Sequence, residues 1–529
     1  MFIHDTLDRA RRLYPATEAA IDGERHLTYA ELGERVDRLA GVLAASGLEP
    51  GARAGVLMQN RVEYTETYFA VEKAGAVLAP LNQRLAPPEI AFILNDAAAT
   101  HLVLDAAYLP SYLACAGDLE TITTLLIVGA GDDLPHTRHV TLDYEQALTS
   151  AQPMRQPARI WQPEDMVQLY YTSGTTGRPK GVMLSQANVV ANAQHAIMTM
   201  HYDDRDTWIH ATPMFHLADA WASWTITWVG GKHIYLREFT PSGYLTALQE
   251  HRVTVSLLVP TMINAIVNDP RVREFDVSSL RLLAFGASPM PVDRLQAAMA
   301  VLPQTVFMQL YGMTETAPFA TALRYDASVV NGPPEVARRL ASCGRAIPGV
   351  DARVVLEDGT EARPGDAGEI VMRGPNIMLG YWRQPEATAD ALRDGWMHSG
   401  DVATVDEEGY IFIVDRKKDM IITGGENVYS TEVENALYRH PAVLEAAVIG
   451  IPDPHWGERV HAIVVLKDGE SLDPQMLSDF CREQIAGYKI PRSVELVDAL
   501  PKTGSGKIQK SVIRDRYWQA HEAATGRRV

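Results

Sequence analysis

One loop of this chain has the residue types to hold phosphate: YYTSGTTGRPKGV, residues 170–182. An apolar approach at 166–169 predicts a strand that leads into hydroxyl side chains and glycines, and Lys180 follows them. Glycines let a backbone come close to an anion, hydroxyls donate hydrogen bonds, and a lysine neutralises negative charge. The loop lacks the spacing of a Walker A motif, as does the GSGK run at 504–507. We therefore predict a phosphate cradle of another kind, with an ordinary polar turn as the alternative.

Further motifs follow this loop, and several hold one charged residue among small ones. In order along the chain they are PMFH (213–216), FGASP (285–289), YGMTET (311–316), HSGD (398–401), DRKKD (415–419), GGENVYSTEVE (424–434) and PKTGSGKI (501–508). Magnesium prefers oxygen ligands and takes few carboxylates beside phosphates and waters. An ionised carboxylate only accepts hydrogen bonds, which suits it to bind hydroxyls. Taken singly, each motif is also typical of a solvated loop.

The whole series, from TSGTTGRPKG at 172–181 to PKTGSGKI at 501–508, resembles the ordered motifs of the adenylate-forming superfamily. That superfamily includes acyl- and aryl-CoA synthetases, luciferases and peptide-synthetase adenylation domains, and the resemblance is closest to fatty-acid and aryl-acid CoA ligases. It implies an α/β fold whose large N-terminal domain, residues 1–415, has two α/β sheets plus a β-barrel-like subdomain and holds ATP and the acyl pocket. A small mobile α+β C-terminal domain, residues 416–529, is expected to follow.

The resemblance also assigns residues to the nucleotide. ATP is expected to lie against Thr172, Ser173, Gly174, Thr175, Thr176, Gly177, Lys180, Gly286, Ala287, Ser288, Tyr311, Gly312, Thr314, Asp401, Arg416 and Lys507. Among these, Thr314 would meet the α-phosphate through its hydroxyl, and Glu315 beside it would hold Mg²⁺. Asp401 would accept hydrogen bonds from both ribose hydroxyls, and Arg416 would add a ribose or phosphate contact. The small residues at 286–288 would leave room for adenine.

Further assignments concern the two half-reactions. Lys507 resembles the lysine that bridges the substrate carboxylate and the α-phosphate, where a preorganised cation is worth most in the transition state. Lys418 matches the hinge about which the small domain swings between the half-reactions. After the swing, Gly424 and Gly425 would face the acyl carbonyl and let pantetheine pass. His216 resembles the residue between acyl pocket and thiol tunnel, although a histidine beside Phe and Leu is also typical of a core.

These assignments predict an ATP-dependent acid–CoA ligase that forms acyl-AMP and pyrophosphate, then acyl-CoA and AMP. The rival is an adenylate-forming enzyme that passes its activated group to an amine, a carrier-protein thiol or another small anion. A luciferase-like oxygenase and a non-catalytic nucleotide-binding relative are weaker alternatives. Small residues at Ala218, Ala222 and Ala284 favour a medium-chain fatty acid or an aryl acid. Tryptophans at helical spacing, Trp221, Trp224 and Trp228, are typical of a core, although one or two of them would border the acyl pocket.

The elements that must position these residues follow from the apolar pattern. Short apolar runs between turn residues predict buried strands at 54–58, 101–105, 124–129 and 256–260. Helical spacing predicts a helix from Tyr29 to Ser46, and the alternation of such helices with strands predicts α/β layers with largely parallel sheets.

The last third of the chain has a different pattern. Dense glycine and proline after about residue 340 predict an antiparallel unit with tight turns and strands at 352–356 and 369–373. The small C-terminal unit is predicted to contain a helix from Ser430, strands at 446–449 and 462–466, and a helix from Asp473.

Composition limits the classes of protein that fit. The composition, 47% hydrophobic and 22% charged, is that of a globular protein. A chain of 529 residues is too long for one hydrophobic core, so two or more domains are expected. The net charge of −18 without a clustered basic face argues against a nucleic-acid partner. The three cysteines are far apart in the sequence and the N-terminus lacks the pattern of a signal peptide, which predicts a cytoplasmic protein. No apolar run approaches the roughly 18 residues needed to span a bilayer, so no transmembrane segment is expected. A homodimer is expected only on general grounds.

Overall fold

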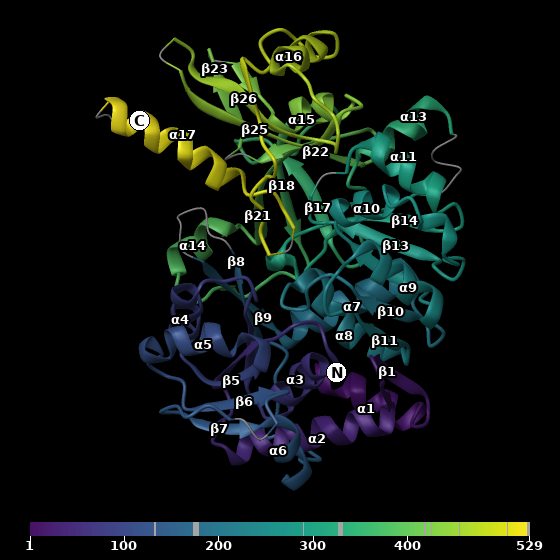
Figure 1. Cartoon of the computed structure of the whole chain (residues 1–529), viewed down its shortest axis with the longest axis vertical. Helices are drawn as coiled ribbons and strands as arrows, with labels where there is room; N and C mark the ends of the chain where they lie inside the picture. Colours follow the sequence, from purple (N-terminus) through teal and green to yellow (C-terminus); the bar gives the residue numbers. More distant parts are fainter. Residues whose placement is uncertain are drawn as a thin grey trace.

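Four sheets and the helices around them make up the described part of the chain (Figure 1). The computed structural model describes residues 1–131, 134–172, 179–288, 290–325, 332–416, 419–424, 426–453, 455–504 and 506–525, apart from the side chains of Glu335 and of residues after 520. The chain opens with α1 (Ile3–Leu13), which lies near α2, α3 and α8.

The first sheet has the strand order β19-β9-β8-β4-β3-β5-β6-β7. Its strands are β3 (Arg53–Leu57), β4 (Val77–Pro80), β5 (Ala99–Asp105), β6 (Thr124–Val128), β7 (Val140–Asp143), β8 (Met166–Thr172), β9 (Lys180–Ser185) and β19 (Gly380–Tyr381). Pairing is parallel from β8 through β7, and antiparallel where β9 joins β8 and β19. The helices of this part of the chain are α2 (Tyr29–Ala45), α3 (Val62–Lys73), α4 (Pro87–Asp96), α5 (Leu109–Cys115), α6 (Tyr144–Ser150) and α7 (Gln186–Met200).

The second sheet has the order β16-β15-β14-β13-β12-β10-β11-β1-β2. Its strands are β1 (Glu18–Asp22), β2 (Arg25–Thr28), β10 (Thr207–His210), β11 (Lys232–Tyr235), β12 (Val255–Leu258), β13 (Leu282–Gly286), β14 (Val306–Tyr311), β15 (Thr321–Tyr325) and β16 (Arg345–Ala346). It is parallel from β1 to β14 and antiparallel at both edges. Its helices are α8 (Leu217–Val229), α9 (Pro241–His251), α10 (Pro260–Val267), α11 (Val292–Val301) and the short α13 (Pro334–Ala337).

The third sheet is antiparallel, as its many turns predict, and supplies one wall of the candidate site. It contains β17 (Asp351–Val355), β18 (Gly368–Arg373), β20 (Leu392–Arg393), β21 (Trp396–Val405) and β22 (Ile411–Arg416), with α14 (Pro385–Ala391) before β20.

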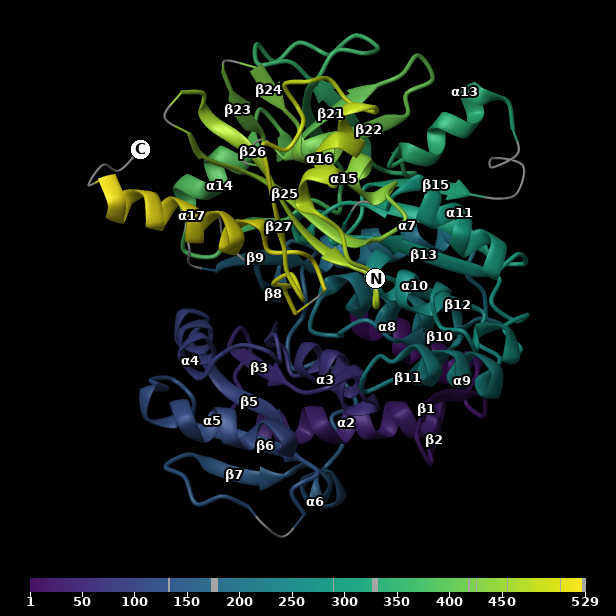
Figure 2. The ribbon, with the colours of Figure 1, turned by 45° about the horizontal axis from the view of Figure 1, so that its top comes forward.

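The C-terminal unit has its own sheet and core and lies at the end of the molecule away from β6 and β7 (Figure 2). Its elements are β23 (Ile421–Thr423), β24 (Glu426–Val428), α15 (Ser430–Tyr438), β25 (Val443–Asp453), β26 (Gly457–Leu466), α16 (Pro474–Arg482), β27 (Ser493–Leu496) and α17 (Lys510–Thr525). The sheet is antiparallel except where β27 joins β26.

The predicted α/β architecture is confirmed, and the predicted elements lie within two residues of the observed bounds, except that β8, β25 and β26 extend three to five residues beyond the predicted strands at 166–169, 446–449 and 462–466. Helix α2 begins where expected because Thr28 and Glu31 form a capping box: each side chain accepts a hydrogen bond from the other residue's backbone N–H. The prediction of largely parallel sheets holds for their centres but misses the antiparallel edge strands, which follow their neighbours through short connections.

None of the helices in the described parts of the chain combines the length and the apolar character that crossing a bilayer requires. All three cysteines, Cys115, Cys343 and Cys481, are buried free thiols.

Candidate active site

The carboxyl ends of the parallel neighbours β13 and β14 bring two of the predicted loops together. At such strand ends an α/β sheet opens a crevice for ligands. Gly286 ends β13 so close to β14 that an added Cβ would lie 2.2 Å from the carbonyl oxygen of Leu310. Gly312, just after β14, has the same restriction, because its Cβ would lie 2.4 Å from the carbonyl oxygen of Pro318. Ala287 adopts a φ of 69°, which is strained for a residue with a side chain.

Asp401 is buried near the end of β14 and is held by one hydrogen bond and one ion pair. Tyr311 at the end of β14 donates its hydroxyl to Asp401 Oδ2 over 2.8 Å. Arg416 places its Nε 3.1 Å from Asp401 Oδ1, because β21 and β22 pair with these two residues directly opposite each other. Burial, and then the Asp401 charge, raise the pKa of Tyr311 far above its ordinary value, so this phenol stays a donor. An ionised carboxylate has about four acceptor positions, so Asp401 keeps room for further donors.

Glu315 lies in a short 3-10 helix, Thr314–Thr316, and its carboxylate is oriented by Tyr381. The Tyr381 hydroxyl donates to Glu315 Oε1 over 2.8 Å, and Lys180 Nζ lies 4.9 Å from the centre of the Tyr381 ring. The antiparallel pairing of β19 with β9 brings Tyr381 beside the strand that begins at Lys180. Sequence reasoning missed Tyr381, whose neighbourhood LGYW carries no charged residue and no motif spacing to mark it.

Lys507 enters this group from the C-terminal unit. Burial and then the Arg416 charge lower the pKa of Lys507 to about 8, while Asp401 and Glu315 act in the opposite direction. The side chain therefore lies within electrostatic reach of residues from three other elements. Its loop is held by hydrogen bonds between Thr503 N and Lys507 O (2.7 Å) and between Gly506 N and Thr503 O (2.9 Å).

His216 is the N-cap of α8, and its Nδ1 accepts a hydrogen bond from Ala218 N over 3.1 Å. The ring is half-buried, and burial together with the nearby Lys507 lowers the pKa of His216 to about 3. The imidazole is therefore neutral near pH 7, with its proton on Nε2.

The rest of α8 is fixed by a buried polar chain that no sequence signal revealed. Asp219, in the first turn of α8, meets His210 (Oδ2 to Nδ1, 2.5 Å), and His210 Nε2 meets His233 Nδ1 over 3.0 Å. His233 Nε2 then meets the hydroxyl of Thr227 near the end of α8 (3.0 Å), and that hydroxyl donates to the carbonyl of Ser223 (2.6 Å). Because the Thr227 proton is used there, His233 must donate from Nε2 and accept at Nδ1, so His210 donates from Nε2. Both ends of α8 are thereby tied to β10 and β11.

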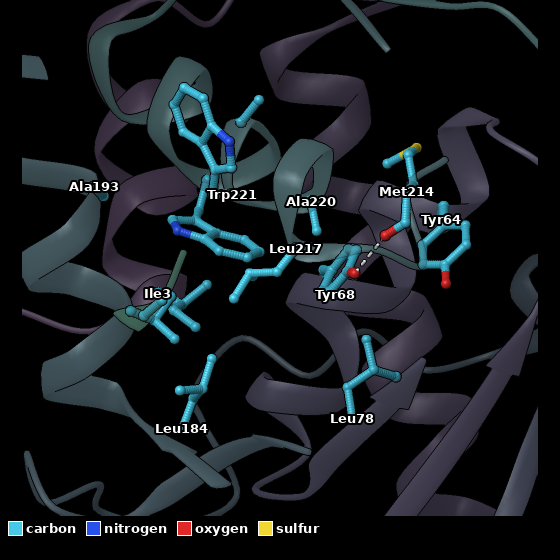
Figure 3. Close-up of a cluster of buried hydrophobic side chains, with 14 of the residues drawn as sticks. Ile3, Tyr64, Tyr68, Leu78, Leu184, Ala193, Met214, Leu217, Ala220 and Trp221 are labelled. Atoms are coloured by element: carbon cyan, nitrogen blue, oxygen red, sulfur yellow. Dashed lines mark hydrogen bonds between the residues drawn. The ribbon is translucent and has the colours of Figure 1, made fainter. Parts of the chain in front are cut away.

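The tryptophans of α8 lie mostly in the core, as predicted. Trp221 and Trp224 are almost fully buried, and Trp221 packs edge-on against Trp208 and Phe319 at 5.1 and 5.5 Å between ring centres. Figure 3 shows Trp221, Leu217 and Ala220 of α8 with Tyr68 of α3 in this cluster. Trp228 is only half-buried. The small residues Ala222 and Ala284 are buried in the same core, whereas Ala218 is half-buried.

The structure thus joins Tyr311 and Arg416 to Asp401 by direct contacts among the predicted residues that it describes. Thr172 and Lys180 lie opposite each other on β8 and β9. Gly424 lies apart from the group, because its N–H donates to the Trp456 carbonyl and an added Cβ would lie 2.6 Å from the Trp456 ring. Seven predicted residues fall outside the described part of the chain, namely Ser173, Gly174, Thr175, Thr176, Gly177, Lys418 and Gly425.

Comparison with known proteins adds a family and named relatives. The model of the AMP-binding enzyme family matches residues 7–382, and that of the AMP-binding enzyme C-terminal domain matches residues 432–507. Feruloyl-CoA synthase of Amycolatopsis sp is 42% identical over 96% of this chain and 98% of its own. Fatty acid–[acyl-carrier-protein] ligase ScoC of Streptomyces coeruleorubidus is 36% identical over 95% and 94%. The anthranilate CoA ligase AuaEII, solved with anthranoyl-AMP, superposes with a TM-score of 0.89 at 25% identity, over 98% of both chains.

Proposed function

The chain belongs to the AMP-binding enzyme family, and we propose that it is an acid–CoA ligase whose substrate is an aryl or medium-chain carboxylic acid. As an AMP-forming acyl-CoA synthetase it uses ATP, Mg²⁺ and CoA. The carboxylate displaces pyrophosphate from ATP to give acyl-AMP, and the CoA thiolate then displaces AMP. The observation that carries the proposal is the buried Asp401 held by Tyr311 and Arg416, with Lys507 of the C-terminal unit close enough for the charges of Arg416, Asp401 and Glu315 to act on its pKa.

The described residues fit these ligands. Asp401 has acceptor positions for the ribose hydroxyls, and Arg416 is fixed beside it. Glu315 is the carboxylate that would bind Mg²⁺, with Tyr381 keeping it in one orientation. No group of three or more His, Cys, Asp or Glu side chains in the described part of the chain could hold a metal ion. Magnesium bound through one carboxylate and the phosphates needs no such group, and it would neutralise charge on the leaving pyrophosphate.

Lys507 is proposed to bridge the acid carboxylate and the α-phosphate. Negative charge grows at that point during attack, so an ammonium already in place stabilises the transition state more than the ground state. His216 cannot supply a second cation because its pKa is near 3. Its neutral Nε2–H is instead available to orient the acid or its acyl carbonyl at the start of α8.

An aryl or medium-chain acid is favoured by the packing along α8. Trp208, Trp221 and Trp224 are almost fully buried and surround this helix with aromatic rings, which suits an apolar acid. The resemblance in sequence to a feruloyl-CoA synthase and in structure to an anthranilate CoA ligase supports an aryl acid. A carrier-protein thiol is the second candidate acceptor, because ScoC is similar over nearly the whole chain.

The organisation of the protein completes the proposal. We place the domain boundary between residues 415 and 416 and the hinge at Lys418, after which Gly424 and Gly425 would reach the acyl carbonyl. A cytoplasmic location agrees with three free thiols, and a homodimer is proposed on general grounds.

The test is an incubation with ATP, Mg²⁺ and a panel of aromatic, straight-chain and branched acids, with and without CoA, read by mass spectrometry. We expect acyl-CoA only when CoA is present, with aryl acids among the best substrates. Lys507→Ala should lose adenylation by about 10²–10³-fold and still convert supplied acyl-AMP to the thioester. Acyl-AMP that CoA does not convert, but a carrier protein does, would assign the second half-reaction to the carrier. Absence of AMP with every acid would contradict the proposal.

A further inference from the structure

Three buried side chains and one half-buried lysine meet where the third sheet joins the C-terminal unit. Asp415 is the next-to-last residue of β22, whereas Ser430 and Glu434 lie on α15 and Lys510 begins α17. Asp415 accepts hydrogen bonds from the backbone N–H of Ser430 and, over 3.0 Å, from its hydroxyl. Lys510 Nζ lies 2.7 Å from the Ser430 hydroxyl and 2.7 Å from Glu434 Oε1. The four residues form one continuous chain of contacts, which we call the junction cluster.

The junction cluster is an unfavourable place for charge unless its members bind each other. Asp415, Ser430 and Glu434 are at most 8% exposed, and the Lys510 side chain is 18% exposed. Burial raises the pKa of both carboxyl groups, and the Lys510 charge acts against that rise. A lysine at a helix N-terminus also opposes the helix dipole. Lys510 is therefore held at this position by the two carboxylates rather than by its own helix.

The cluster connects the two units at the residues that matter for the reaction. Asp415 directly precedes Arg416, which pairs with Asp401 in the large unit. Lys510 follows Lys507 by three residues, and the loop between them is stiff, because Lys502 and Ile508 form a β-bridge and Gln509 N donates to Pro501 O over 2.8 Å. A shift of Lys510 relative to Asp415 would thus move Lys507 relative to Arg416 and Asp401.

We propose that Lys510 and Asp415 are positioning residues for the first half-reaction. Through Ser430 they link the C-terminal unit to the third sheet in the orientation that puts Lys507 into the site. The link serves adenylation alone, because thioester formation requires the unit to turn and Lys507 to leave. This inference rests on the proposed acid–CoA ligase function.

The experiment measures the half-reactions separately in Lys510→Met and Asp415→Asn. Pyrophosphate release without CoA reports adenylation, and thioester formation from synthetic acyl-AMP and CoA reports the second step. We expect adenylation to fall at least tenfold while thioester formation stays within twofold to threefold of wild type. Lys510→Arg, which keeps the cation, should restore most of the adenylation rate.

Lys489→Met is the matched control. Lys489 also forms a 2.7 Å ion pair, with Glu432, and its side chain is 18% exposed like that of Lys510, but both partners lie in the C-terminal unit. Lys489→Met should leave both half-reactions unchanged. Equal losses in both half-reactions for Lys510→Met and Asp415→Asn, or no loss in either, would overturn the inference. If Lys510→Met does not fold, Asp415→Asn decides alone. Failure of wild-type protein to form acyl-AMP from any acid would instead refute the proposed function.

Discussion

Raising the pH should stop adenylation by removing the charge of Lys507. Burial and the neighbouring Arg416 lower the pKa of this lysine from 10.5 to about 8. A lysine whose pKa is lowered is charged below that pKa and neutral above it. Because the proposed role of Lys507 needs an ammonium, the first half-reaction should decline as the pH rises through 8. Thioester formation from supplied acyl-AMP should lack this decline, since Lys507 takes no part in it.

The size of the effect follows from the shift. At pH 9 a group with a pKa of 8 keeps its proton in about one tenth of the molecules, so kcat/KM for adenylation should fall about tenfold between pH 7 and pH 9. The shift of 10.5 to about 8 corresponds to about 3 kcal/mol in favour of the neutral amine. Bound ATP and acid bring negative charge to the amine and oppose this preference. The pH profile of kcat reports the pKa of Lys507 in the enzyme–substrate complex, whereas that of kcat/KM reports its pKa in the free enzyme. The apparent pKa from kcat should therefore be higher than that from kcat/KM.

The assay is pyrophosphate release without CoA between pH 6 and pH 10, with wild type beside Lys507→Arg and Arg416→Met. An arginine stays charged throughout, so the slower Lys507→Arg enzyme should show no decline near pH 8. Arg416→Met removes a neighbouring cation and should move the bend upward. His216 should add no bend between pH 5 and pH 8, because its pKa is already near 3.

Two results would refute this reasoning. A bend near pH 8 that persists in Lys507→Arg would belong to another group. A wild-type profile that stays flat to pH 10 would mean that the pKa of Lys507 is not lowered in the free enzyme.

Two other features of the site give separate predictions. Tyr381→Phe removes the hydrogen bond to Glu315, so half-saturation of adenylation should need severalfold more Mg²⁺; an unchanged Mg²⁺ titration would contradict the role given to Tyr381. Asp219→Asn leaves His210 without its buried carboxylate, which should cost about 3 kcal/mol of unfolding free energy in urea. The matched change Asp203→Asn breaks an exposed ion pair and should lower the free energy of unfolding by less than about 1 kcal/mol. Equal decreases in the two variants would show that the buried ion pair stabilises the fold no more than the exposed one.

The sequence predicted the elements well where the pattern is local. Helix α2 follows from spacing and a capping box, and the buried strands follow from short apolar runs, because these signals depend on residues close in the chain. The parallel pairing also follows, since helices that alternate with strands must cross over. Edge strands such as β15 were missed because an antiparallel return depends on the connection rather than on the strand's own residues.

The charged members of the site were predictable because each stands in a recognisable motif, as Asp401 does in HSGD. The residues that hold these charged side chains in place could not be predicted. Tyr381 reaches Glu315 across 66 positions, and Lys510 reaches Ser430 across 80, so no local spacing marks either pair. The buried contacts of His210 with Asp219 and His233 likewise depend on how α8 packs against β10 and β11. Supporting residues are set by tertiary contacts, and a single sequence does not contain those contacts as a pattern.

The lowered pKa of Lys507 and the junction cluster act in opposite directions on the same movement. In our proposal the cluster favours the orientation that places Lys507 in the site, whereas desolvation and the Arg416 charge, which Asp401 and Glu315 offset only in part, disfavour its ammonium there. ATP and the acid remove that penalty by bringing phosphate and carboxylate charge to Lys507, so they should draw the C-terminal unit in. Once pyrophosphate has left, acyl-AMP carries a single negative charge and the penalty partly returns. In the proposed mechanism, the loss of charge in the first half-reaction should therefore favour the release of Lys507 before the second half-reaction.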